Sequence, residues 1–315
     1  MADRPRSPLD VVVIGGGVAG LTAGLFAARG GASTLVLAPG IPGGQLATID
    51  RAEDFPGFLD GVAGYELGPT IQEQAADAGA EFQMAEAQGF EARDGGWLVT
   101  TSEGAFATKT VIVASGSRPR ALGVPGEERL IGRGVSHCAS CDGPLLRGRA
   151  VVVVGAGDSG LQEALTLAGF AADVLVAHRA EAPTAQELYR RRVRECSNIR
   201  MRGNTIVEEI LGDNSVTGVR VRDLATDATS VLETSAVFIY IGLEPNTAFL
   251  RDTVLLDDTG HIPTDIWMRT ELPGVFAAGD VRSDSASQAI AAAGDGATAA
   301  IAARRYLDAR RDEGG

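Results

Sequence analysis

The stretch Gly15-Gly16-Gly17-Val18-Ala19-Gly20 follows the apolar run Asp10–Ile14 and precedes the small-residue segment Leu21–Arg29. A short β-branched run that ends at glycine is typical of a buried parallel strand, so the sequence predicts strand, turn and helix. The glycines at the first, third and last positions of the stretch have the G-x-G-x-x-G spacing of a dinucleotide-binding turn. The first permits the bend, the second lets backbone approach a pyrophosphate, and the third lets helix pack on strand.

The same pattern recurs from Gly155, after a predicted strand at Ala150–Val154 and before a predicted helix that begins at Leu161. One such turn is weak evidence because glycine-rich turns are common, whereas two in the required context are much stronger. The alternative is a pair of structural turns that bind no ligand. The predicted dinucleotide-binding glycines are Gly15, Gly17 and Gly20 in the first turn and Gly155, Gly157 and Gly160 in the second.

Between the two turns lies Cys138-Ala139-Ser140-Cys141-Asp142-Gly143. Two cysteines three apart can close a small disulfide ring, and the thiolate form that attacks disulfides is favoured at a helix start. A neighbouring carboxylic acid can return a proton to a leaving thiol. A flavin can take hydride from a nicotinamide and reduce a nearby disulfide. The alternative is a pair of buried, inert thiols; Cys196, which has no partner in sequence, is predicted to be structural.

Bulk composition narrows the class of protein. The 315 residues suggest two domains, and a hydrophobic content of 45% lets each bury a core. The formal net charge of −13 argues against nucleic acid or an anionic membrane as a partner. Three cysteines are too few for a secreted disulfide framework or a structural zinc site, so no metal is predicted. With no signal region and no apolar run of about 20 residues, a cytoplasmic protein is expected.

Proline and glycine mark two linkers, the first around Pro119–Gly126 and the second at Leu243-Glu244-Pro245-Asn246. The predicted fold is α/β, with two Rossmann-like dinucleotide-binding domains, one inserted into the other. The discontinuous domain comprises residues 1–118 and 245–315, and the inserted domain comprises residues 119–244 with the cysteine pair. In the returning segment, Val275–Asp280 is predicted to be a strand that ends in an acid. The helical stretch Ser287–Arg304 is expected to be interrupted at Gly294-Asp295-Gly296.

Together these residues resemble the low-molecular-weight thioredoxin reductases over nearly the whole chain. The most specific match is the cysteine stretch, which is close to the family's C-A-T-C-D-G. Further matches occur in the family order at Gly43-Gly44-Gln45, Phe55-Pro56-Gly57, Gly126-Glu127 and Gly274-Val275-Phe276-Ala277-Ala278-Gly279-Asp280. The resemblance implies a homodimer with an FAD domain split around a pyridine-nucleotide domain. Electrons would pass from NAD(P)H through FAD and the cysteine pair to a thioredoxin-like protein.

The resemblance also implies roles for individual residues. Cys141 would face the flavin, Cys138 would attack the partner disulfide, and Asp142 would be the acid/base. Asp54 stands where the family has Asn, and an ionised carboxylate close to the flavin would disfavour anionic reduced flavin. The alternative role for Asp280 is a helix N-cap. Besides the first glycine turn, the residues assigned to FAD are Gly44, Gln45, Asp54, Gly279, Asp280, Gln288 and Ala289.

The expected NADPH motif departs from the family's H-R-R-x-x-x-R. The segment reads His178-Arg179-Ala180-Glu181-Ala182-Pro183-Thr184, so only the first arginine remains. Bidentate arginine contacts are the usual means of holding a 2′-phosphate. His178 and Arg179 remain the predicted contacts, unless an arginine of Arg190–Arg192 folds back. The acid that would select NAD is also missing at the strand end, although Glu181 could supply it from the loop. NADH is therefore a plausible donor, and a donor other than a pyridine nucleotide is also possible.

Three functional hypotheses follow. The leading one is a thioredoxin-reductase-like flavoenzyme. The second is a related flavin-dependent oxidase of small dithiols, or a disulfide reductase linked to ferredoxin or another donor in place of NADPH. The third is an FAD-binding sensor or scaffold without activity, against which the retained Cys138, Cys141 and Asp142 argue.

Overall fold

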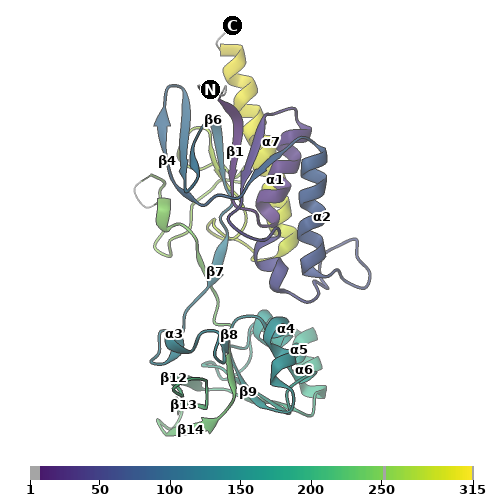
Figure 1. The fold of residues 1–315 in the computed structure, drawn as a ribbon, viewed down its shortest axis with the longest axis vertical. Coiled ribbons are helices and arrows are strands. Elements are labelled where there is room, and N and C mark those ends of the chain that lie inside the picture. The colour runs from purple at the N-terminus through teal and green to yellow at the C-terminus, as the bar shows by residue number, and fades with distance from the viewer. Residues whose placement is uncertain (1–7, 251–252, 314–315) are drawn as a thin grey trace. The chain divides into compact units, whose positions relative to one another are not determined.

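Two parallel sheets organise the chain, one in each of two units, in a computed structural model that describes residues 8–250 and 253–313. The first unit comprises the described residues up to Arg118 and from Glu244 onward, and the second is Pro119–Leu243 (Figure 1). Both are mixed α/β, which confirms the predicted fold class. The chain passes between the units at β7 (Ser117–Pro119) and β16 (Leu243–Pro245), which pair with each other.

The sheet of the first unit has the strand order β3-β2-β1-β6-β5-β4, with β17 also paired to β6. The strands β3, β2, β1, β6 and β17 run parallel, and β5 and β4 are added as an antiparallel meander. The bounds of these strands are β1 Leu9–Ile14, β2 Thr34–Leu37, β3 Glu81–Gln83, β4 Ala87–Arg93, β5 Gly96–Thr101, β6 Gly104–Val113 and β17 Val275–Ala277.

Alternate residues of the central strands enter two cores, because successive side chains of a strand point to opposite faces. Val11 and Val13 pack with α1 (Val18–Arg29) and α7 (Ala289–Glu313) on one face. In Figure 1 these two helices lie beside α2 (Gly64–Asp77). The opposite face packs against the β4–β5 meander and the segment around the short helix η3 (Ala248–Leu250). A second short helix, η1 (Gly44–Thr48), follows β2.

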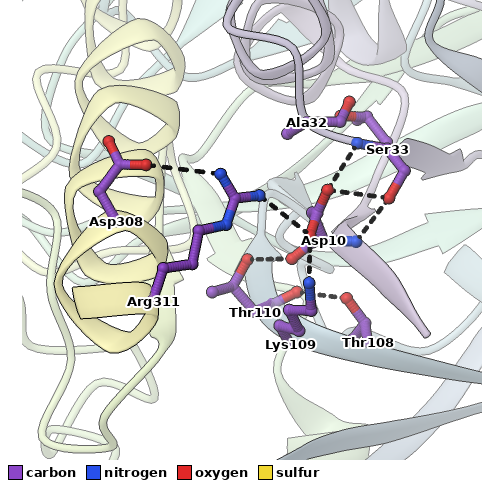
Figure 2. A network of polar contacts seen from close by, with 9 residues as sticks. Asp10, Ala32, Ser33, Thr108, Lys109, Thr110, Asp308 and Arg311 are labelled. Carbon is purple, nitrogen blue, oxygen red and sulfur yellow. Dashed lines mark hydrogen bonds and ion pairs between the residues drawn. The ribbon is translucent and has the colours of Figure 1, made fainter. Parts of the chain in front are cut away.

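A buried carboxylate connects β1, the start of β2, β6 and the last turns of α7 (Figure 2). Asp10 is 8% exposed and accepts hydrogen bonds from the Ser33 amide at 3.0 Å and from Lys109 Nζ at 2.7 Å. Arg311 lies 3.9 Å away on α7. Burial alone would raise the pKa of Asp10, but the hydrogen bonds from Lys109 and Ser33 outweigh it and hold that pKa below its ordinary value.

The second unit has a five-stranded parallel sheet in the order β11-β10-β9-β15-β8. One face is covered by α5 and α6, and the other by the antiparallel sheet β12-β13-β14. The strand bounds are β8 Val135–Ser136, β9 Ala150–Val154, β10 Asp173–Ala177, β11 Ile199–Arg202, β12 Thr205–Leu211, β13 Gly218–Asp223, β14 Thr229–Glu233 and β15 Ala236–Ile239. The helices are α3 Glu127–Leu130, α4 Ala139–Asp142, η2 Gly143–Leu146, α5 Asp158–Ala168 and α6 Glu187–Glu195.

One predicted break in a helix is wrong. The segment Gly294-Asp295-Gly296 does not interrupt the last helix, because α7 runs without a break from Ala289 to Glu313. A Cβ on Gly296 would lie 2.1 Å from the carbonyl oxygen of Ala19, so glycine lets α7 approach α1 closely. In the described part of the chain, no helix combines the length and apolar character needed to cross a membrane.

Candidate active site

The first glycine turn joins β1 to α1. At two of its positions, nearby backbone atoms leave room for glycine alone. Gly15 has φ +121°, and a Cβ there would lie 2.1 Å from the Ala114 carbonyl oxygen. A Cβ on Gly20 would lie 1.9 Å from the Gly15 carbonyl oxygen. No side chain fits at either position without a backbone shift.

Gly17 differs, because it has space around it. It is the N-cap of α1, and no heavy atom lies within 4 Å of the position that its Cβ would occupy. The free amides at the helix N-terminus and the positive end of its dipole lie at this open position. The turn therefore fits the pyrophosphate of a dinucleotide, as FAD requires.

The second turn, between β9 and α5, repeats this geometry. Gly155 has φ +112°, and its Cβ would lie 2.0 Å from the Tyr240 carbonyl oxygen. A Cβ on Gly160 would lie 2.3 Å from the Gly155 carbonyl oxygen. At Gly157, the N-cap of α5, the nearest atom is Thr184 Oγ1 at 3.9 Å. This turn also fits a dinucleotide pyrophosphate, as a nicotinamide cofactor requires.

A polar network in the first unit joins two of the residues assigned to FAD. Gln45 Nε2 donates to both the carbonyl oxygen and the hydroxyl of Ser117, each at 2.9 Å. The Ser117 hydroxyl lies 3.4 Å from Asp280 Oδ2, and the Ser285 hydroxyl donates to Asp280 Oδ1 at 2.9 Å. The network orients the Gln45 amide and the half-buried Asp280 carboxylate. The sequence predicted no role for Ser117 and Ser285. Their only distinguishing feature in the sequence is that they follow the predicted strands that correspond to β6 and β17.

The residues that follow β17 are hydrogen-bonded to α7. Gly279 donates its amide to Asp295 Oδ2 at 3.1 Å, and Arg282 Nε donates to the same oxygen at 2.6 Å. Gln288 immediately precedes α7, and Ala289, its first residue, packs in the core cluster that also contains residues of α1 and η1.

The remaining two residues assigned to FAD lie on loops. Gly44 has φ +58° and begins η1, where its Cβ would lie 3.1 Å from the Cα of Gly17. Asp54 is exposed in the loop between Ala52 and Val62. The structure therefore places Gly44 at the first glycine turn, whereas Asp54 belongs to a separate surface loop.

The cysteine pair forms a disulfide in the second unit, with 5.3 Å between the two Cα atoms. Cys138 caps α4, and its Sγ accepts the Cys141 amide at 3.2 Å. Cys141 is exposed, and the half-buried Asp142 follows it as the last residue of α4. Cys196 lies outside the disulfide and packs against the core of the same unit. Once an accessible disulfide is reduced, one of its thiolates can attack another disulfide, and a neighbouring carboxyl group can donate a proton to the leaving thiolate.

The segment after β10 contains His178 and Arg179, the predicted contacts of the nicotinamide cofactor. His178 is 7% exposed. Burial lowers its pKa, although a hydrogen bond at the Ala180 backbone opposes that shift, so the imidazole is neutral near pH 7. Arg179 is exposed. Arg190 pairs with Glu187 of its own helix at 3.1 Å, so this arginine does not fold back toward His178.

Comparison with known proteins agrees with this chemistry. The family model described as pyridine nucleotide-disulphide oxidoreductase matches residues 9–296. A thioredoxin reductase of Treponema pallidum is 40% identical over 299 residues, covering 95% of this chain and 97% of that protein.

Solved structures agree as well. The thioredoxin reductase of Lactococcus lactis superimposes with a TM-score of 0.93 at 37% identity, covering 95% of this chain and 99% of that one. That of T. acidophilum has a TM-score of 0.91 at 36% identity, covering 96% of this chain and 99% of that one. The chain therefore belongs to the pyridine nucleotide-disulphide oxidoreductase family, among its low-molecular-weight thioredoxin reductases.

Proposed function

We propose that this FAD-dependent disulfide oxidoreductase takes electrons from NADH in preference to NADPH and delivers them to a thioredoxin-like protein. We further propose that it works as a homodimer in the cytoplasm. The observation that carries the proposal is the Cys138–Cys141 disulfide beside Asp142, in a unit that also has a glycine turn open to a dinucleotide.

The two cofactors would be bound by residues of different units. FAD would be held in the first unit by the turn of Gly15, Gly17 and Gly20, with Gln45 and Asp280 as its polar contacts. The nicotinamide cofactor would be held in the second by Gly155, Gly157 and Gly160. When bound, the flavin supplies the cysteine pair with electrons that originate from the nicotinamide.

The cysteines and Asp142 would carry out the exchange. The Cys138 thiolate attacks one sulfur of the partner disulfide, forming a mixed disulfide and releasing the other partner sulfur as a thiolate. Protonated Asp142 donates a proton to that leaving thiolate. Cys141 Sγ then attacks Cys138 Sγ, which re-forms the internal disulfide and releases the second partner thiolate.

The preference for NADH follows from the segment after β10. A buried neutral His178 brings no positive charge, Arg190 is engaged with Glu187, and Arg179 is left as the one cation retained from the family motif. A 2′-phosphate held by one arginine in place of three loses charge-assisted hydrogen bonds worth about 1.5–3 kcal/mol each.

The test is anaerobic reduction of the bound flavin, followed by its absorbance, with NADH and NADPH at matched concentrations. We expect faster bleaching by NADH. Faster bleaching by NADPH would contradict the donor preference. No bleaching by either, together with bleaching by a small dithiol or reduced ferredoxin, would favour the oxidase or ferredoxin-linked hypotheses.

Partner choice is tested separately with the variant Cys141→Ser, which keeps Cys138 but cannot resolve a mixed disulfide. Incubation with oxidised thioredoxin should yield a covalent adduct that dithiothreitol releases. The matched control is Cys196→Ser, which keeps both active-site cysteines and should give no adduct. A pure FAD-binding scaffold would give none with either variant.

A further inference from the structure

Tyr240 lies between the second glycine turn and the cysteine pair. It follows β15, which lies in the sheet between β9, the strand of the glycine turn, and β8, the strand before the cysteines. Its Cβ would be 3.7 Å from a Cβ on Gly160, and its ring packs against the cluster that contains Ala139 and Leu161. The half-buried side chain therefore packs against residues of both α4 and α5.

The hydroxyl of Tyr240 is buried, and its proton has no acceptor in the described part of the chain, although the Ala139 amide lies close to its oxygen. Buried polar groups are nearly always paired, so one without a partner beside a redox centre calls for a functional reason. Burial raises the pKa of Tyr240 far above its usual range, the charges of Glu163 and Asp142 add to this, and the Ala139 amide opposes it. The phenol therefore stays protonated near neutral pH and can act as a hydrogen-bond donor.

Reduction of the disulfide creates a new hydrogen-bond acceptor at Cys138, one residue before Ala139 in the cluster against which Tyr240 packs. Two electrons and one proton convert the Cys138–Cys141 bond into one thiolate and one thiol. Ala139, whose amide lies close to the Tyr240 hydroxyl, is the residue directly after Cys138. In the oxidised state, Cys138 Sγ already accepts the Cys141 amide. A second donor at this sulfur would favour its ionised form.

We propose that Tyr240 is a positioning residue whose hydroxyl donates a hydrogen bond to the Cys138 thiolate once the disulfide is reduced. The proposal rests on the proposed function, in which Cys138 is the attacking sulfur. The hydroxyl proton lacks an acceptor in the oxidised state and gains one in the reduced state.

Other titratable groups also lie near this site. The carboxyl groups of Asp142 on α4 and the buried Glu163 on α5 also act on Tyr240, and a negative charge on either would oppose a thiolate at Cys138. His137, just before the cysteines, is held through Nδ1 to the carbonyl oxygen of Ile239 at 3.0 Å. A neutral donor such as Tyr240 favours the thiolate without adding charge.

The experiment measures the pH profile of Cys138 alkylation. The holoenzyme is reduced with a phosphine, treated with iodoacetamide between pH 5 and pH 10, and digested, and modification at Cys138 is followed by mass spectrometry. In Tyr240→Phe, the pKa of Cys138 should rise by about one unit, and alkylation at pH 7 should slow about tenfold. The matched control is Tyr189→Phe, which removes another buried hydroxyl of the same unit, hydrogen-bonded to Gln162, and should leave the profile unchanged.

An unchanged profile in Tyr240→Phe, with both variants folded by circular dichroism, would overturn the proposal. An equal shift in both variants would also overturn it, because the effect would then be one of general packing. The assay uses neither a nicotinamide cofactor nor thioredoxin. Its failure would therefore leave the proposed function standing, and a failed flavin-bleaching test would not alter the alkylation result.

Discussion

The variant Gly17→Ala separates cofactor binding from folding in the first unit. The backbone of Gly17, with φ −74° and ψ 177°, is open to any residue, and no atom lies within 4 Å of the added methyl group. The neighbouring Gly20 is the contrasting case, since its methyl group would lie 1.9 Å from the Gly15 carbonyl oxygen. A methyl group at position 17 therefore occupies only the space assigned to the pyrophosphate.

Two opposing effects set the stability of the apoprotein. Replacing glycine with alanine reduces the entropy of the unfolded chain and stabilises by about 0.4–1 kcal/mol. Alanine is a poorer N-cap than glycine, which costs a similar amount. The free energy of unfolding should therefore change by less than about 1 kcal/mol. Losing one hydrogen bond from a helix amide to a phosphate costs about 1.5–3 kcal/mol, so FAD should bind about 10–100-fold more weakly.

The assay pairs urea unfolding of the apoprotein with FAD titration of the same preparation, followed by flavin fluorescence. Gly20→Ala serves as the comparison, and it should lose several kcal/mol of stability because backbone must move. The assignment of this space to the pyrophosphate is refuted if Gly17→Ala binds FAD as tightly as the original protein. It is also refuted if the variant unfolds as easily as Gly20→Ala, because the space around Gly17 would then be filled.

Three further predictions concern separate parts of the chain. Asp10→Asn should lower the free energy of unfolding by about 1–2 kcal/mol at pH 7. The folded-state pKa of Asp10 is depressed. The loss of stability in Asp10→Asn should therefore be full above pH ~4 and should disappear as the pH falls below that value, as followed by acid unfolding curves. Arg282→Met leaves the buried Asp295 without its ion pair and should cost about 3 kcal/mol in urea unfolding, whereas Arg269→Met, at an exposed pair, should cost less than about 1 kcal/mol. Gly157→Ala should raise the NADH concentration needed for half-maximal bleaching about tenfold or more while FAD occupancy stays unchanged.

The parts of the site that depend on local geometry were predictable. A turn that places Gly20 against Gly15 needs glycine at a fixed spacing, so the pattern shows in the sequence. The disulfide between Cys138 and Cys141 is equally local, because it closes within one helical turn. Both features depend on residues only a few positions apart.

The parts that depend on distant residues were not predictable. Gln45 and Asp280 are joined through Ser117, which is far from both in sequence. The helix break expected around Asp295 is absent. The Asp295 carboxylate is held by Arg282, and the adjacent Gly296 packs on α1. These tertiary contacts outweigh the low helix propensity of glycine. The sheet β12-β13-β14 was also missed, since its strands lack a distinctive motif.

The discontinuity of the first unit has a consequence for synthesis on the ribosome. Strand β6 is made before Pro119–Leu243, but β17, which pairs with it, and α7, which covers α1, are made afterwards. At about 5–20 residues per second, the apolar face of the early strands stays uncovered for roughly 10–30 seconds. The inserted unit is continuous in sequence and can complete its core during that interval. Nascent chains stalled before Val275 should therefore protect the inserted unit from protease while leaving the first unit open to cleavage.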